Sequence, residues 1–446
     1  MSTKNFAFNE VNQKLLAFLN ESPTSFHAVA NMRAELEKAG FTRLLEGCAW
    51  ELKAGGKYYV TRNESALIAF KIPKADFAGF QIMASHSDSP AFKIKANAEI
   101  EVEKKYVKLN VEKYGGMIFA PWLDRPLSVA GRVVVRTAEG VKTRLVRVDK
   151  DLLIIPNLAI HMNRQVNEGY EFNAQKDMLP LFSCGAEEEA KGSFLRLIAK
   201  EAGVAVEDIL DTDLFLYNRM QGTILGLNGE FIAAGHLDDL QCAFSSMEGL
   251  IAAEPKDSVA VHCVMDNEEV GSGTKQGAAS TFLKDTLHRI NSGLGRSEEE
   301  YLTALASSFM VSADNAHGIH PNQPDKGDPT NRPILNEGIV IKYSANQKYT
   351  TDAISGAIFK ALCEKAEVPY QTFHNRSDML GGSTLGNISG NQVALNTVDI
   401  GLPQLAMHSI YETAGSKDTA YLVEAAKVLF SASVCGDGDG NYQLNW

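Results

Sequence analysis

The sequence predicts an α/β fold, in which helices flank a mixed, mostly parallel sheet and a β-rich domain is inserted into the chain. Three observations support this prediction. After about Phe231, short apolar segments alternate with helical patterns of about 10–15 residues, as in largely parallel sheets. Within residues 91–231, residues 93–111 instead show the two-residue periodicity of a half-buried strand. The length of 446 residues is enough for two or three folding units of about 150 residues each.

The first ninety residues predict two helices and a strand. Apolar residues recur at helical spacing over residues 11–19, and a Ser-Pro pair ends this pattern. A second helix begins near Phe26 and ends near Gly40, because glycine favours helix termination. The apolar run from Phe80 to Ala84 predicts a buried strand.

The residue pattern of the stretch that follows predicts an inserted domain. Residues 93–111 alternate polar and apolar side chains, which predicts one antiparallel strand, and residues 131–148 predict a hairpin. Helical patterns lie near residues 193–202 and 206–210. We therefore expect two domains. The first domain is discontinuous and consists of residues 1–90 and 232–446. The inserted β-rich domain consists of residues 91–231.

The remainder of the chain alternates between predicted helices and predicted strands. Its apolar segments are short and continuous, so they predict strands that are buried on both faces. The expected helices are residues 239–253, 277–288 and 352–366, and the expected strands are residues 258–265, 309–313, 339–343 and 393–400.

Composition limits the class of protein. Lys and Arg number 43 and Asp and Glu number 55, so the net charge is −12, which argues against a nucleic-acid partner. No apolar run reaches the roughly 18–20 residues of a membrane span, so no membrane partner is expected. The six cysteines form no C-x-x-C pair, and the N-terminal residues lack a secretory pattern. We expect a cytoplasmic protein.

Acidic residues and histidines follow several of the predicted strands. The strand near residue 84 leads into His86 and Asp88, and the strand ending near residue 265 leads into Glu268 and Glu269. Asp314 follows the strand of residues 309–313 in the same way. Because ligands of open α/β sheets bind at the carboxyl ends of the strands, these side chains can meet in one crevice.

Such a set of residues suits a divalent metal. Histidines and carboxylates are ligands of zinc and related ions, and the donors suffice for two ions that share one carboxylate. A carboxylate outside the ligand set would then act as general base. Simpler interpretations exist for each part, with Asp238 as a helix N-cap, Glu268-Glu269 as a solvated turn and His408 as a core histidine.

Several longer motifs point to one family. SHSDSPAFKIK, LDRPLSVAGRVVVR, IPNLAIHMNR, HLDDL, MDNEEVGS, VSADNAHGIHPN and PQLAMHSIYE occur in this order over most of the chain. Together they resemble the aspartyl aminopeptidases and, more broadly, the metallopeptidase family that includes the yeast vacuolar aminopeptidase. The resemblance implies a zinc-exopeptidase-like fold whose inserted β-rich domain serves dimerisation.

The resemblance also implies roles for single residues. Glu268 would be the general base, and Asp88 would orient a metal-binding histidine. Asp238 would bridge two metal ions. The implied metal ligands are His86, Asp238, Glu269, Asp314 and His408.

Three further positions would concern the substrate. Lys342 and His317 match family residues that line the pocket for an acidic N-terminal side chain, and His161 matches a catalytic histidine that reaches a neighbouring subunit's site. His236 and Tyr411 stand where relatives carry arginine, so the preference for an acidic N-terminal residue can differ from that of the relatives.

The resulting hypothesis is an aminopeptidase with two divalent ions, most fittingly zinc, with cobalt or manganese as alternatives, that removes N-terminal Asp or Glu from peptides. One alternative is an aminopeptidase of broader or neutral preference, and another is a catalytically silent assembly scaffold. The resemblance further implies a homo-oligomer, a tetrahedral dodecamer built from dimers.

Overall fold

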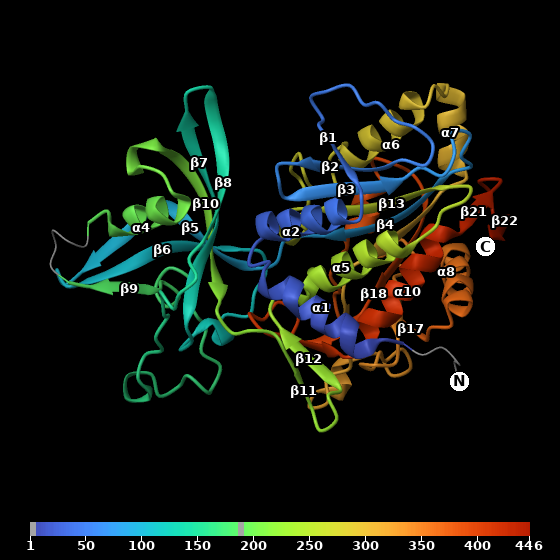
Figure 1. Cartoon of the computed structure of the whole chain (residues 1–446). Helices are drawn as coiled ribbons and strands as arrows, with labels where there is room; N and C mark the ends of the chain where they lie inside the picture. The colour runs from blue at the N-terminus through green and yellow to red at the C-terminus, as the bar shows by residue number, and fades with distance from the viewer. Residues whose placement is uncertain (1–5, 186–190) are drawn as a thin grey trace.

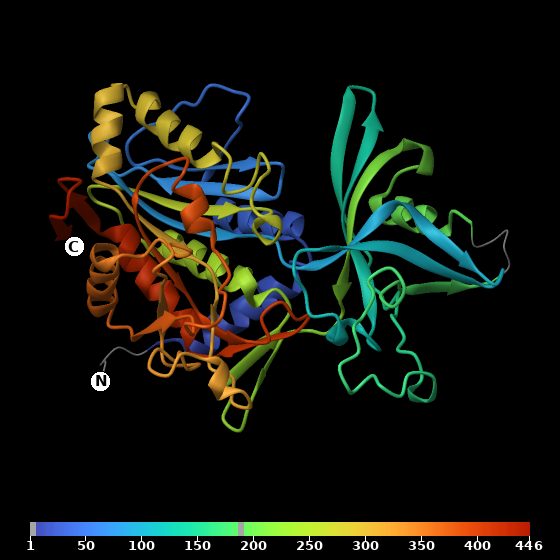
Figure 2. The same cartoon turned by 180° about the vertical axis from the view of Figure 1, so that it is seen from behind.

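The computed structural model describes residues 6–185 and 191–446, which form two lobes joined by a narrow connection (Figures 1 and 2). The larger lobe is built on a nine-stranded sheet, and the smaller lobe on a six-stranded sheet. In spatial order, the nine strands are β1 (Thr42–Leu44), β2 (Lys57–Arg62), β3 (Ala66–Lys71), β13 (Val259–Met265), β4 (Phe80–His86), β14 (Phe309–Ala313), β18 (Asn396–Gly401), β16 (Ile339–Tyr343) and β17 (Tyr370–His374).

The centre of the large sheet is parallel. Strands β13, β4, β14 and β18 run in one direction, whereas β3 pairs antiparallel with β13 and β16 pairs antiparallel with β18. All seven residues of β13 and of β4 are buried, as expected for strands covered on both faces. The predicted mixed, mostly parallel sheet flanked by helices is therefore confirmed.

Helices cover both faces of this sheet. Because side chains alternate along a strand, Met83 of β4 packs into one core and Ile82 into the other. Phe359 and Leu429 lie in the first core, and Phe282 lies in the second. The first face carries α1 (Phe8–Asn20), α2 (Ser25–Lys38), α5 (Leu237–Ala252), α8 (Ala353–Ala366) and α10 (Asp418–Ser431), and the second carries α6 (Phe282–Gly293), α7 (Glu298–Ala306) and α9 (Leu385–Ser389).

The smaller lobe is antiparallel and has a core of its own, to which Phe92, Trp122 and Leu216 contribute. Helix α4 (Ser193–Ala202) packs on this core through Phe194 and Ile198. In spatial order, the strands are β8 (Gly140–Arg147), β7 (Leu127–Thr137), β10 (Ile209–Asn218), β5 (Ala91–Val102), β6 (Tyr106–Tyr114) and β9 (Leu181–Cys184).

The remaining elements are small. A five-stranded sheet at the base of the large lobe joins distant segments, and a hairpin lies near the C-terminus (Figure 1). The five strands are β11 (Thr223–Leu225), β12 (Phe231–Ala234), β20 (Glu412–Gly415), β19 (Pro403–Leu405) and β15 (Ala316–His317), the hairpin is β21 (Ser433–Gly436) with β22 (Tyr442–Asn445), and the 3₁₀ turns are η1 (Ala120–Trp122), η2 (Ile160–Met162), η3 (Val206–Asp208), η4 (Glu268–Val270) and η5 (Pro324–Lys326).

Three sequence predictions need correction. Residues 93–111 are not one strand, because Glu103 and Lys104 turn the chain with φ values of 53° and 54° and separate β5 from β6. Residues 206–210 form one 3₁₀ turn and the start of β10 instead of a helix. Helix α6 begins at Phe282, five residues after the expected start at Gly277.

Candidate active site

The carboxyl ends of the central strands bring the candidate site together. His86 is the last residue of β4, Glu268 and Glu269 form η4 after β13, and Asp314 follows β14. Asp238 lies in the first turn of α5, where the peptide bond to Asp239 is cis. The fifth candidate ligand, His408, lies on the loop between β19 and β20, with a φ of 64°.

Two groups of candidate ligands share one carboxylate. His86, Asp238 and Asp314 offer donor atoms within 4.8 Å of one another, and so do Asp238, Glu269 and His408. Nε2 of His86 lies 3.6 Å from Oδ1 of Asp238, and Nε2 of His408 lies 3.4 Å from Oδ2 of Asp238. The two oxygens of Asp238 therefore face opposite histidines, as a bridging carboxylate requires.

A third group overlaps with these two. Donor atoms of His86, Glu268 and Glu269 also lie within 4.8 Å of one another. Nε2 of His408 lies 3.4 Å from Oε2 of Glu269, which places Glu269 beside the second histidine. Glu268 therefore lies within reach of the candidate ligands His86 and Glu269.

The donor set fits a divalent cation. Oδ1 of Asp238 and Oε1 of Glu269 are buried and have no hydrogen-bond partner, although such atoms are normally satisfied. Burial raises the pKa of Glu268 to about 7 and raises the pKa of Glu269 and of Asp314. Closely packed carboxylates in a dry site repel one another unless a cation lies between them. Nitrogen and oxygen donors of this kind suit zinc.

Neighbouring residues orient the candidate ligands. The carbonyl oxygen of Asp88 accepts a hydrogen bond from Nδ1 of His86 at 3.0 Å. Because a carbonyl can only accept, Nδ1 carries the proton and Nε2 is left as the ligand atom. A carboxylate oxygen of Asp239 accepts the backbone N–H of His86 at 3.1 Å. The position of His86 is thus fixed from two sides.

Glu412 plays a similar part and was missed from the sequence. Its two carboxylate oxygens accept the backbone N–H groups of Asp238, at 3.0 Å, and of His408, at 2.8 Å. Burial raises the pKa of Glu412 to about 8. The only sequence signal is its place at the end of PQLAMHSIYE, four residues after His408.

The residues expected to bind the substrate differ in how deeply their side chains are buried. Lys342 on β16 is buried, and its Nζ donates to the carbonyl of Asn315 at 2.9 Å and lies 5.5 Å from the ring centre of Tyr349. Burial opposes the Lys342 charge, but Asp314 and the other acidic groups nearby together outweigh burial and raise the Lys342 pKa. His317 on β15 is exposed, and its ring packs edge-on against Phe373 at 6.1 Å.

His161 lies apart from this cluster. It occupies η2 on the long loop between β8 and β9, and its side chain is exposed. Among the described residues, none of the groups able to hold a metal includes His161. Figure 1 places this loop on the smaller lobe, away from the strand ends of the large sheet.

Comparison with known proteins decides the family. A family model for Aminopeptidase I zinc metalloprotease (M18) matches residues 18–430. The chain belongs to the M18 family. It is 46% identical over 427 residues to a probable M18 family aminopeptidase 2 of Clostridium acetobutylicum, covering 95% of this chain and 99% of the relative. A Pseudomonas aeruginosa relative of the same description is 44% identical over 429 residues and covers the same shares of the two chains.

Solved M18 structures share the fold. A chain in the cryo-EM structure of the Ape4 and Nbr1 complex matches with a TM-score of 0.91 and 36% identity, covering 95% of this chain and 86% of that one. The crystal structure of yeast aminopeptidase 1 matches with a TM-score of 0.83 and 29% identity, covering 95% and 97%. This M18 protein is therefore a metalloaminopeptidase with the mixed α/β fold of its relatives. Within residues 6–185 and 191–446, no helix has the length and apolar character to cross a membrane.

Proposed function

We propose that this M18 aminopeptidase removes N-terminal Asp and Glu residues from peptides and uses two divalent metal ions, most fittingly zinc. The observation that carries the two-ion proposal is the position of Asp238, whose two oxygens face His86 and His408. His86, Asp238 and Asp314 would hold one ion, and Asp238, Glu269 and His408 the other. A bound metal pair supplies Lewis acidity at the scissile carbonyl.

The protein side chains would handle the proton. Glu268 takes a proton from the attacking water and delivers it to the leaving amine nitrogen as the C–N bond breaks. Its raised pKa suits both steps, since a base that ionises near neutral pH can also return the proton. Asp88 accepts the backbone N–H of Glu268 at 3.1 Å and so helps to hold the base in place.

Acidic preference would come from Lys342. Its ammonium group is the cation next to Asp314, and a substrate carboxylate near it would gain a charge-assisted hydrogen bond. His317, on the edge of the same region, would line the pocket. His236 and Tyr411 replace family arginines, so an aminopeptidase of broader or neutral preference remains the second candidate.

Assembly would complete the site. The solved relatives include a dodecamer of mApe1 from S. cerevisiae. We extend this to a tetrahedral dodecamer of dimers in which the inserted domain, residues 91–231, makes the dimer contacts. The exposed His161 would then enter a neighbour's site and stabilise the developing oxyanion. A cytoplasmic location and peptide substrates complete the proposal.

One experiment tests the core of the proposal. The purified protein is analysed for metal content per chain, and Asp-, Glu- and Leu-anilide hydrolysis is measured before and after chelation. We expect two ions per chain, faster cleavage of Asp and Glu than of Leu, and loss of activity that zinc, cobalt or manganese restores. Equal rates on Leu-anilide would support the broader preference. A folded, metal-free protein that no ion activates would support the scaffold alternative.

A further inference from the structure

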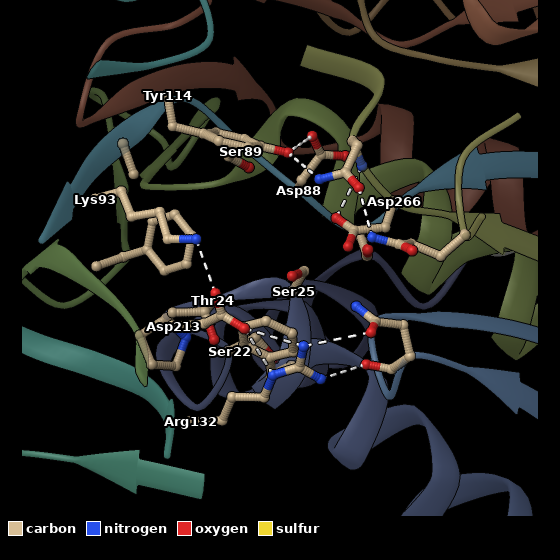
Figure 3. Close-up of a pocket in the computed structure, with 18 of the residues that line it drawn as sticks. Ser22, Thr24, Ser25, Asp88, Ser89, Lys93, Tyr114, Arg132, Asp213 and Asp266 are labelled. Atoms are coloured by element: carbon tan, nitrogen blue, oxygen red, sulfur yellow. Dashed lines mark hydrogen bonds and ion pairs between the residues drawn. The ribbon is translucent and has the colours of Figure 1, made fainter. Parts of the chain in front are cut away.

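Tyr114 connects the smaller lobe to the candidate active site. It is the last residue of β6, and its hydroxyl donates a hydrogen bond to Oδ2 of Asp88 at 2.6 Å (Figure 3). The same hydroxyl accepts a hydrogen bond from Nδ2 of Asn267 at 2.8 Å. One side chain of the inserted sheet thus contacts two loops at the strand ends of the large sheet.

Asp88 in turn contacts the proposed general base and two of the proposed metal ligands. Its Oδ1 accepts the backbone N–H of Glu268 at 3.1 Å, and its Oδ2 accepts the backbone N–H of Glu269 at 3.2 Å. Its carbonyl fixes the ring of His86 at 3.0 Å. We infer that Tyr114 is a positioning residue of the active site, which acts through Asp88 to hold the general base and two metal ligands in register. This inference rests on the metal site proposed above.

Side chains of the same sheet hold Tyr114 in place. Its ring packs edge-on against Phe215 of β10, with the ring centres 5.7 Å apart. On the same sheet, Asp213 accepts hydrogen bonds from Lys93 at 2.7 Å and from Arg132 at 3.0 Å. These contacts join strands β5, β7 and β10 next to Tyr114 (Figure 3). The hydroxyl is therefore presented from a fixed support.

Arg132 makes a second contact between the two lobes. Arg132 donates to the carbonyl of Asn63 at 2.7 Å, and its guanidinium lies 4.2 Å from the ring centre of Phe26 on α2. A cavity of about 410 Å³ lies between these contacts and Asp88, and Tyr114 forms part of its wall. The Tyr114–Asp88 hydrogen bond therefore lies at the wall of this cavity.

The inference is tested with Tyr114→Phe, which removes only the hydroxyl. We expect kcat to fall about 10–100-fold and zinc affinity, measured by competition with a chromophoric chelator, to fall about 10-fold, the usual effect of losing a partner of a metal ligand. KM should change less than about two-fold, because a residue that acts only through Asp88 leaves substrate binding unchanged. The control is Tyr217→Phe, since the buried Tyr217 donates to the Val148 carbonyl at 2.9 Å in the same lobe.

A double variant tests whether Tyr114 acts through Asp88. If Tyr114 acts through Asp88, adding Tyr114→Phe to Asp88→Asn should lower kcat by less than about two-fold beyond Asp88→Asn alone. Unchanged kcat and zinc affinity in Tyr114→Phe would overturn the inference, and so would equal losses in Tyr217→Phe or full additivity in the double variant. The zinc-affinity measurement is made without substrate, so it stays decisive even if the proposed acidic preference is wrong.

Discussion

Nζ of Lys342 lies 3.4 Å from Oδ1 of Asp314, so a buried cation adjoins a candidate metal ligand. The ammonium group also donates to the Asn315 carbonyl, and both contacts hold it at the floor of the site. A residue in this position can influence the metal site and the substrate at the same time. Only a comparison between substrates separates the two effects.

We predict that Lys342→Met lowers kcat/KM for Asp-anilide about 10–100-fold more than for Leu-anilide, because only the acidic substrate loses a charge-assisted hydrogen bond. The ratio of the two kcat/KM values is the measurement. Lys71→Met is the matched control, since Lys71 is also buried and donates to backbone carbonyls, of Ile251 and Ala253. An equal fall for both substrates would assign Lys342 to the metal site instead.

Glu268→Gln should lower kcat by about 10²–10⁴-fold, the usual contribution of a general base, while metal content stays at the wild-type level. Glutamine keeps the size of the side chain but cannot take the proton. Metal analysis and steady-state kinetics on the same preparation check this. Loss of metal together with activity would show that Glu268 acts as a ligand, which its place in the His86–Glu268–Glu269 group would also allow.

His161 is best tested by complementation between subunits. His161→Ala and Glu268→Gln should each have little activity, but their co-expressed mixture should recover about a quarter of the wild-type rate if dimers pair at random. In a mixed dimer, one site receives an intact base and an intact His161 from different chains. A mixture no more active than the sum of its separate components would show that His161 does not act on a neighbour's site.

A buried histidine should make stability pH-dependent. His262 on β13 bonds to Ser246 at 2.8 Å, and burial lowers the His262 pKa to about 3, below the value of about 6.5 for an unfolded chain. Between these values the unfolded state binds a proton that the folded state does not. The free energy of unfolding should therefore fall by about 1.4 kcal/mol per pH unit as the pH drops below about 6.5.

The measurement for His262 is the melting temperature between pH 7 and pH 4.5. His262→Gln removes the titrating group, so its melting temperature should fall less steeply with acid than that of the wild type. His288→Gln, at an exposed position on α6, is the control and should follow the wild type. Parallel curves for all three proteins would show that His262 does not contribute to acid unfolding.

The sequence predicted the strong periodic elements and the acids at their ends. Residues 259–265 and 309–313 are largely apolar, so both the strands and the position of the acids after them could be predicted. Strands β1, β2 and β3 were missed, although β3 is fully buried between β2 and β13; β1, at the edge of the sheet, has only three residues. The start of α6 was placed too early because small residues precede Phe282.

The contacts behind the site were harder to anticipate. Glu412 and Tyr114 are 298 residues apart in sequence, and neither lies at the end of a central strand. Their roles depend on hydrogen bonds to Asp238, His408 and Asp88, which only the packed structure reveals. Periodicity identifies which face of an element is buried, but it does not say which polar groups will meet.

The strand order of the large sheet also constrains how the chain folds during synthesis. β13 lies between β3 and β4, so the centre of the sheet cannot close until residue 265 has been made. All six strands of the smaller lobe lie within residues 91–218 and have been made by then. At about 5–20 residues per second, β4 waits roughly 10–40 s for β13. The smaller lobe can therefore fold first, while the apolar edge of β4 stays exposed until β13 pairs with it.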